Sequence, residues 1–114
     1  MTQSPTCTTD ADVRAAFGTV CTVIGTYDLQ DITNAKGAVM KSWPVVRLEG
    51  GGRAVLIESV WDDSKRPDDA TIAAHRGKKV AVTGPLHAQP PAPGRAANMA
   101  MPCISPVETL RLLP

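Results

Sequence analysis

Apolar and β-branched residues occur along this chain in short runs, and residues typical of turns separate the runs. Runs of this length and composition indicate β-strands. Gly25 lies inside the first run and predicts a bend, while Pro44 places the second run at a sheet edge or at a bulge. The pattern predicts a mainly β domain with five strands, over residues 20–27 (continuing toward 32), 38–48, 53–61, 79–86 and 104–113.

Two further segments carry the signals of helices. Thr9 is a suitable N-cap, acidic residues follow it in the first turn, and Gly18 ends this short helix. A second helix is expected over 67–76, between the third and fourth strands, because a proline and two aspartates open that segment. Residues 1–8 are rich in Thr and lack periodicity, so we expect a flexible tail before a single domain over 9–114.

Two segments of the chain show internal sequence similarity. Residues 10–27 and 69–86 align without a gap, and both copies read helix, glycine, strand, glycine. Gly25 and Gly84 occupy matching strand positions in the two copies. A glycine inside a strand marks a bend, a bulge or the close approach of another backbone, so we predict one of these at each position.

The order strand, strand, strand, helix, strand, strand, over about residues 18–113, resembles the OB-fold. The segment GKKVAVTGPL, at 77–86, is similar to the fourth strand of many small bacterial OB proteins. The resemblance implies a five-stranded Greek-key barrel with a helix between its third and fourth strands. It also implies a ligand surface on the outer face of the second and third strands, beside the loop between the fourth and fifth. It implies no particular activity, because one fold hosts many functions.

Charge and aromatic content narrow the choice of ligand. The 12 basic and 11 acidic residues nearly balance, so no overall field attracts nucleic acid or an anionic membrane. Two Trp, one Tyr and one Phe are few for a surface that stacks bases. The first residues show no charged leader, and no run reaches the ~18 apolar residues of a membrane span. We therefore expect no signal peptide, no membrane association and a cytoplasmic location.

The residue types that carry metal or acid–base chemistry show no recognisable spacing. No close ligand pair of the kind that zinc sites use occurs among Cys21, Cys103, His75 and His87. A Cys103 nucleophile with His87 as its base is conceivable, yet nothing nearby marks a cysteine of low pKa. We therefore expect no metal, no cofactor and no catalytic residue, and we expect all three cysteines to be reduced and none to be essential.

The remaining candidate site is a binding surface on the second and third strands. Lys41, Trp43, Arg47 and Arg53 fall on or near the outer face of these strands. A tryptophan among three cations suits a single nucleic-acid strand, because the ring stacks on a base while the cations neutralise phosphates. The simpler interpretation is an ordinary mixed surface with Trp43 packed on Pro44.

The segment 87–101 offers a second candidate surface. It is rich in Ala and Pro and carries His87, Met99 and Met101. Long segments without secondary structure are often functional. The apolar content of this one suits contact with a protein better than contact with phosphate.

These observations favour a non-catalytic binding or adaptor module that docks on a protein partner through Trp43, the strand-two edge and the 87–101 loop. The alternative is a single-stranded nucleic-acid binder that uses Trp43 and the neighbouring cations. A small-ligand-binding or enzymatic domain is the least favoured interpretation, because no acid–base pair or nucleophile stands out. Salt-dependent binding to an oligonucleotide distinguishes the first two hypotheses.

Overall fold

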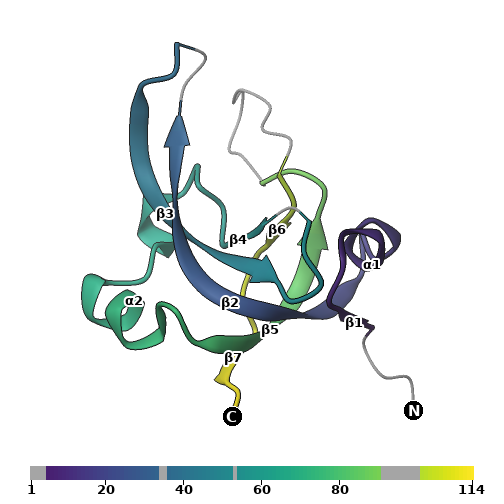
Figure 1. Cartoon of the computed structure of the whole chain (residues 1–114). Coiled ribbons are helices and arrows are strands. Elements are labelled where there is room, and N and C mark those ends of the chain that lie inside the picture. Colours follow the sequence, from purple (N-terminus) through teal and green to yellow (C-terminus); the bar gives the residue numbers. More distant parts are fainter. Residues whose placement is uncertain (1–4, 34–35, 53, 91–100) are drawn as a thin grey trace.

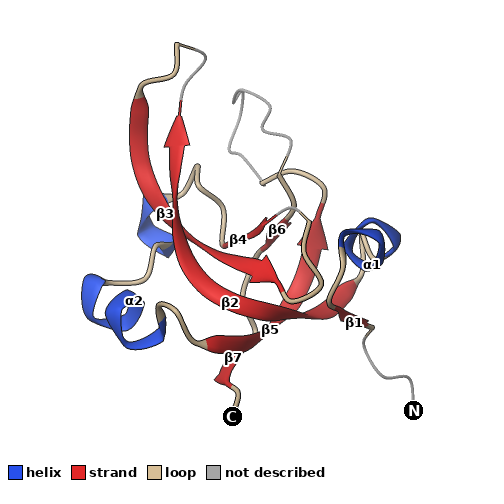
Figure 2. Cartoon of the chain, viewed as in Figure 1, coloured by secondary structure: helices blue, strands red, loops and turns tan. Residues whose placement is uncertain are grey.

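Figure 1 shows the computed structural model of the chain, in which strands predominate and the predicted mainly β class is confirmed. The structure describes residues 5–33, 36–52, 54–90 and 101–114. Two short helices flank the sheet on opposite sides (Figure 2). Within the described residues the elements are β1 (Thr6–Cys7), α1 (Asp10–Ala15), β2 (Val20–Thr33), β3 (Val39–Leu48), β4 (Ala54–Ile57), a 3-10 turn (Asp63–Lys65), α2 (Asp69–His75), β5 (Lys79–His87), β6 (Cys103–Ile104) and β7 (Thr109–Leu112).

Five of the strands form a ring within one sheet. β2 pairs with β3, β3 with β4, β4 with β6, β6 with β5, and β5 pairs again with β2. The β4–β6 pairing is parallel, and the other four pairings of the ring are antiparallel. β2 joins the two ends because its first half pairs with β5 and its second half with β3. Outside the ring, β1 adds to β2 in parallel and β7 adds to β5 in antiparallel orientation.

Two of the predicted strands are shorter than their apolar runs suggested. The third ends at Ile57 rather than at 61, because Glu58 takes a positive φ of 70° and turns the chain. The fifth is divided into β6 and β7 around Pro106, which donates no hydrogen bond. The Glu58 carboxylate accepts hydrogen bonds from Ser105 Oγ at 2.9 Å and from the Val107 amide at 2.8 Å. The side chain of Glu58 thus satisfies groups that strand pairing leaves open at this break.

The prediction of a flexible tail over residues 1–8 is wrong for the end of that segment. Thr6 and Cys7 form β1, and the Cys7 side chain is buried in the main core. The backbone carbonyls of Pro5 and Thr8 accept hydrogen bonds from the amides of Thr22 and Gly50, at 2.8 and 2.7 Å. Two residues are too few to show an alternating pattern, so no strand signal is present in this part of the sequence.

Local capping explains where the helices begin. Thr9 forms a reciprocal capping box with Asp12, whose amide donates to Thr9 Oγ1 at 3.2 Å. Asp68 caps α2 by accepting a hydrogen bond from the Thr71 amide at 2.8 Å. α2 follows β4 along the chain and precedes β5, and its Ile72 side chain is buried in the main core.

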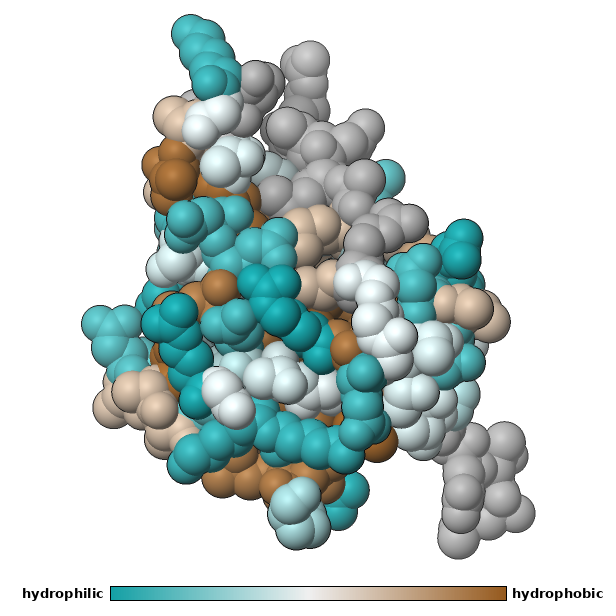
Figure 3. Space-filling model, in the orientation of Figure 1, coloured by the Kyte–Doolittle hydropathy of each residue, from teal (hydrophilic) through white to brown (hydrophobic). Residues whose placement is uncertain are grey.

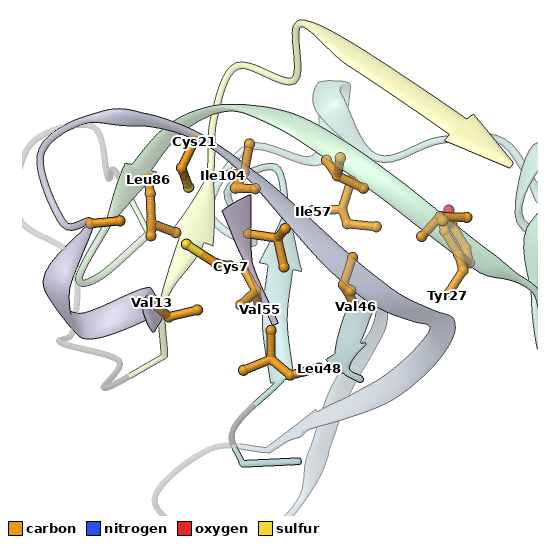
Figure 4. Packing of buried hydrophobic residues seen from close by; sticks show 14 of the residues in the cluster. Cys7, Val13, Cys21, Tyr27, Val46, Leu48, Val55, Ile57, Leu86 and Ile104 are labelled. Atoms are coloured by element: carbon orange, nitrogen blue, oxygen red, sulfur yellow. The ribbon is translucent and has the colours of Figure 1, made fainter. Parts of the chain in front are cut away.

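The main core fills the ring with inward-facing side chains (Figure 4). Along the first half of β2, Cys21, Val23 and Tyr27 are buried. Thr22, Ile24 and Thr26, which alternate with the buried positions, are more exposed. This alternation has the period of two that a strand imposes on its side chains. Residues of β1, β3, β4, β5, β6 and both helices complete the cluster.

Gly25 and Gly84 lie where two backbones approach one another. A Cβ atom added to Gly25 would overlap the carbonyl oxygen of Arg47 and lie 2.7 Å from its carbonyl carbon. A Cβ atom added to Gly84 would lie 2.5 Å from the carbonyl oxygen of Pro106. The predicted close backbone approach is therefore confirmed at both glycines.

Candidate functional site

The β2–β3 pair extends well beyond the ring. The pairing of β2 with β5 runs from Val20 to Thr26 and stops there. The pairing of β3 with β4 begins only at Val45. The rest of the pair, residues 29–33 and 39–44, forms a two-stranded arm that projects from the ring in Figure 1. We call these residues the arm. A register shift at Ile32 and Thr33 interrupts the pairing near its end.

The expectation that Trp43 is an exposed docking or stacking residue is wrong. Its side chain is 0% exposed, and its indole Nε1 donates to the carbonyl oxygens of Ile57 and Glu58, at 2.8 and 3.1 Å. Trp43 belongs to a second apolar cluster on the outer side of β3 and β4, which we call the outer cluster. Its buried members are Ile32, Trp43, Val45, Ala54, Leu56, Val60 and Cys103, with Trp61 and Met101 packed against them. No base or partner side chain reaches the Trp43 ring in this arrangement.

Lys41 supports the outer cluster rather than presenting a cation to solvent. Its Nζ donates to the Val60 carbonyl oxygen and contacts Asp63 Oδ1, both at 2.7 Å. The same nitrogen lies 5.4 Å from the centroid of the Trp43 ring. The Lys41 side chain thus joins the arm to the segment that follows β4 and offsets its charge against a nearby carboxylate.

Arg47 is exposed but paired. Its Nε lies 2.7 Å from Asp28 Oδ2, and Arg76 Nε lies 3.3 Å from Asp28 Oδ1. The hydrogen bond from Arg47, followed by that from the Leu29 amide, holds the pKa of Asp28 below its usual value. The two guanidinium groups share one carboxylate, so this surface carries less positive charge than the arginines alone suggest.

His87 and Met101 both contact other parts of the chain. His87 Nε2 lies 2.8 Å from the Ser105 carbonyl oxygen. Met101 packs against the outer cluster, and its sulfur lies 3.6 Å from Gln30 Nε2. Of the predicted site, the structure therefore brings Lys41, Trp43 and Met101 together, and it gives Arg47 and His87 separate partners. The predicted site residues Arg53 and Met99 lie outside the described residues.

Sequence reasoning missed two exposed apolar residues of the arm. Val39 is 59% exposed and Met40 is 49% exposed, and they follow one another where β3 begins. Figure 3 shows apolar surface on the flank of the arm, beside polar side chains that cross the middle of this face. Both residues belong to an apolar run that predicts a strand, and the run alone does not reveal that its first residues lie beyond the ring.

Metal ligands and reactive thiols are the remaining candidates for chemistry among the described residues. These residues contain no group of three or more His, Cys, Asp or Glu side chains that could hold a metal ion. Cys103 is fully buried, and burial raises the pKa of its thiol to about 12. Such a thiol is a poor nucleophile at neutral pH, although Cys103 pairs in register with His87.

The helices of the described part of the chain are short, and none is long and apolar enough to cross a membrane. The groups present offer apolar contact on the arm and paired charges beside it, and among the described residues they offer no assembled reactive centre. No protein-family model, no curated protein and no solved structure matches this chain.

Proposed function

We propose that the ring is an OB-type Greek-key barrel. Numbered in chain order, its strands β2, β3, β4, β5 and β6 are the first to the fifth, and the fourth lies beside the first. The resulting spatial order, 4-1-2-3, is that of a Greek key. The parallel pairing of the third and fifth strands and a helix between the third and fourth support the same assignment.

The protein acts, in this proposal, as a non-catalytic module that docks on a protein partner through the arm. The observation that carries the proposal is the exposure of Val39 and Met40, which are consecutive in β3 on a projecting two-stranded element. Burial of an exposed apolar side chain contributes about 1.5–3 kcal/mol. Methionine also adapts its shape to an apolar pocket. The complementary surface is therefore a shallow apolar pocket on a folded protein.

A single nucleic-acid strand is a less suitable partner for this surface. Trp43 is internal, so the stacking platform that a single strand requires is lost. The cations nearby are matched by acids, Lys41 by Asp63 at 2.7 Å and Arg47 by Asp28 at 2.7 Å. Phosphate contacts dominate the affinity of nonspecific nucleic-acid binding, and paired cations make such contacts weakly.

The experiment compares the wild type with one double variant and one single variant in the native cell. Val39→Ser with Met40→Ser removes the apolar surface of the arm. Leu112→Ser is the matched control, because Leu112 is 50% exposed but lies on β7. A photo-activated cross-linker is placed near the arm in each background, and both proteins are checked for unchanged melting temperature.

We expect a discrete protein adduct with the wild-type chain and with Leu112→Ser, and its loss in the arm variant. An adduct that persists in the arm variant would show that the arm does not dock the partner. An oligonucleotide adduct in place of a protein would instead support the nucleic-acid hypothesis.

A further inference from the structure

Two cysteines face one another inside the ring. β1 and β2 are parallel, with Cys7 in register with Val23, and both Cys7 and Cys21 point into the main core (Figure 4). The two side chains are near enough for each thiol to shift the pKa of the other, and Cys7 Sγ donates to the Asp12 carbonyl oxygen at 3.5 Å. The third cysteine, Cys103, lies apart from this pair in the outer cluster.

A cavity gives small molecules a route to one member of the pair. It has a volume of about 240 Å³ and is bounded by β1, by Ala15 and Ala16 at the end of α1, and by Thr19. Cys7 lines this cavity, whereas Cys21 is not among its lining residues. A reagent that enters the cavity therefore meets Cys7 first.

We propose that Cys7 and Cys21 form a reversible disulfide that fastens β1 to the ring, and that the oxidant is a low-molecular-weight disulfide. The Cys7 thiolate attacks one sulfur of the oxidant, forms a mixed disulfide and releases one thiol. The Cys21 thiolate then attacks Cys7 Sγ, forms the Cys7–Cys21 bond and releases the second thiol. Two protein thiols lose two protons and two electrons, and the oxidant becomes two thiols.

The positions of the two thiols explain why Cys7 attacks the oxidant and Cys21 attacks the mixed disulfide. Burial raises the pKa of Cys7, and the hydrogen bond from Cys21 lowers it, while the charge of Asp12 raises it. Burial raises the pKa of Cys21 to about 12, with a further contribution from Cys7. Cys7 is the thiol that lines the cavity, so it is the one that an entering oxidant meets first. Both thiols are mostly protonated at neutral pH, which makes the pair slow to oxidise while the surroundings are reducing.

The bond would act on a short element. β1 has two residues, and its flanking residues Pro5 and Thr8 each accept one backbone hydrogen bond, from Thr22 and Gly50. A cross-link from Cys7 to β2 restrains this strand because it closes a short loop of chain. Oxidation thus keeps the N-terminal strand on the ring, and reduction allows it to open locally.

Treatment of the full chain with oxidised glutathione, followed by intact and peptide mass spectrometry, tests the proposal. Three variants accompany the wild type: Cys7→Ala, Cys21→Ala and the matched control Cys103→Ala. We expect the wild type and Cys103→Ala to lose two hydrogen atoms and to yield a peptide pair joined through Cys7 and Cys21. Cys21→Ala should keep a glutathione adduct on Cys7, and Cys7→Ala should gain neither product.

Hydrogen exchange of the oxidised wild type provides a second readout. The Thr22 and Gly50 amides should exchange at least about tenfold more slowly after oxidation, because their partners flank the fastened strand. Dithiothreitol should restore the original rates. A wild type that forms no Cys7–Cys21 bond, a first adduct on Cys21 or Cys103, or unchanged exchange at both amides would each overturn the proposal.

Discussion

Replacing Gly25 by alanine should strongly destabilise the protein, although the change adds only one methyl group. An alanine that fits the native backbone usually stabilises a protein by about 0.4–1 kcal/mol, because it restricts the unfolded chain. At Gly25 the new Cβ would overlap the carbonyl oxygen of Arg47 and lie 2.9 Å from Val46 Cγ1. The overlapped atom belongs to the backbone, so a change of side-chain rotamer does not relieve it.

The size of the destabilisation follows from the displacement of β3 that the added methyl group requires. β3 can withdraw from Gly25 only by breaking backbone pairing with β2 on one side or with β4 on the other, because Val46 is in register with both Tyr27 and Val55. Each lost backbone hydrogen bond costs about 1 kcal/mol, and a buried group left without a partner costs about 1–3 kcal/mol. Two buried groups left without partners cost about 2–6 kcal/mol, a large part of the about 5–15 kcal/mol that stabilises an ordinary domain.

Urea unfolding monitored by tryptophan fluorescence measures the effect, because Trp43 is buried in the folded state. Gly18→Ala is the control. Gly18 has a φ of +85° and nothing within 4 Å of an added Cβ, so that variant reports the cost of backbone conformation alone, about 1 kcal/mol. Gly84→Ala should fall between the two, because Pro106 belongs to no strand and yields more easily. A Gly25→Ala protein as stable as the wild type, or more stable than Gly18→Ala, would refute the reasoning.

Three further predictions concern the outer face. Trp43→Phe removes the donor to the Ile57 carbonyl and part of a buried ring, and should lower the free energy of unfolding by about 2–4 kcal/mol in urea titrations; a loss below about 1 kcal/mol would contradict the buried placement. Fluorescence anisotropy with a labelled mixed-sequence strand of about 20 nucleotides should show no binding tighter than about 10 micromolar at physiological salt. Sub-micromolar, salt-sensitive binding would revive the nucleic-acid hypothesis. The Arg47 hydrogen bond lowers the folded-state pKa of Asp28, so its contribution to stability is present above the ordinary pKa and is lost as the pH falls through the lowered one. The wild type should therefore lose more stability than Asp28→Asn between about pH 5 and pH 3, and equal losses in denaturant titrations would contradict this.

The fold was predictable where the signal was local. The apolar runs located the strands of the ring, and the two strand glycines indicated close approach before any partner was known. The division of the fifth strand was not predictable, although Pro106 was visible in the sequence. The break depends on the carboxylate of Glu58, which accepts hydrogen bonds from a segment 47 and 49 residues away along the chain. A pattern with a period of two contains no information about such a contact.

The misassignment of Trp43 and the omission of Val39 and Met40 have one physical origin. Alternation correctly separates the two faces of β3, but it does not say which length of each face is covered. β3 has 10 residues and β4 has only 4, so β4 pairs only with Val45, Val46 and Arg47, while the outer cluster extends to Trp43 and leaves the beginning of β3 uncovered. Val60 and Trp61 then pack against Trp43, whereas Val39 and Met40 lie beyond their reach and stay exposed. Exposure on this strand is therefore set by the length of its neighbour, and the apolar residues farthest from β4 are the ones that a partner can bury.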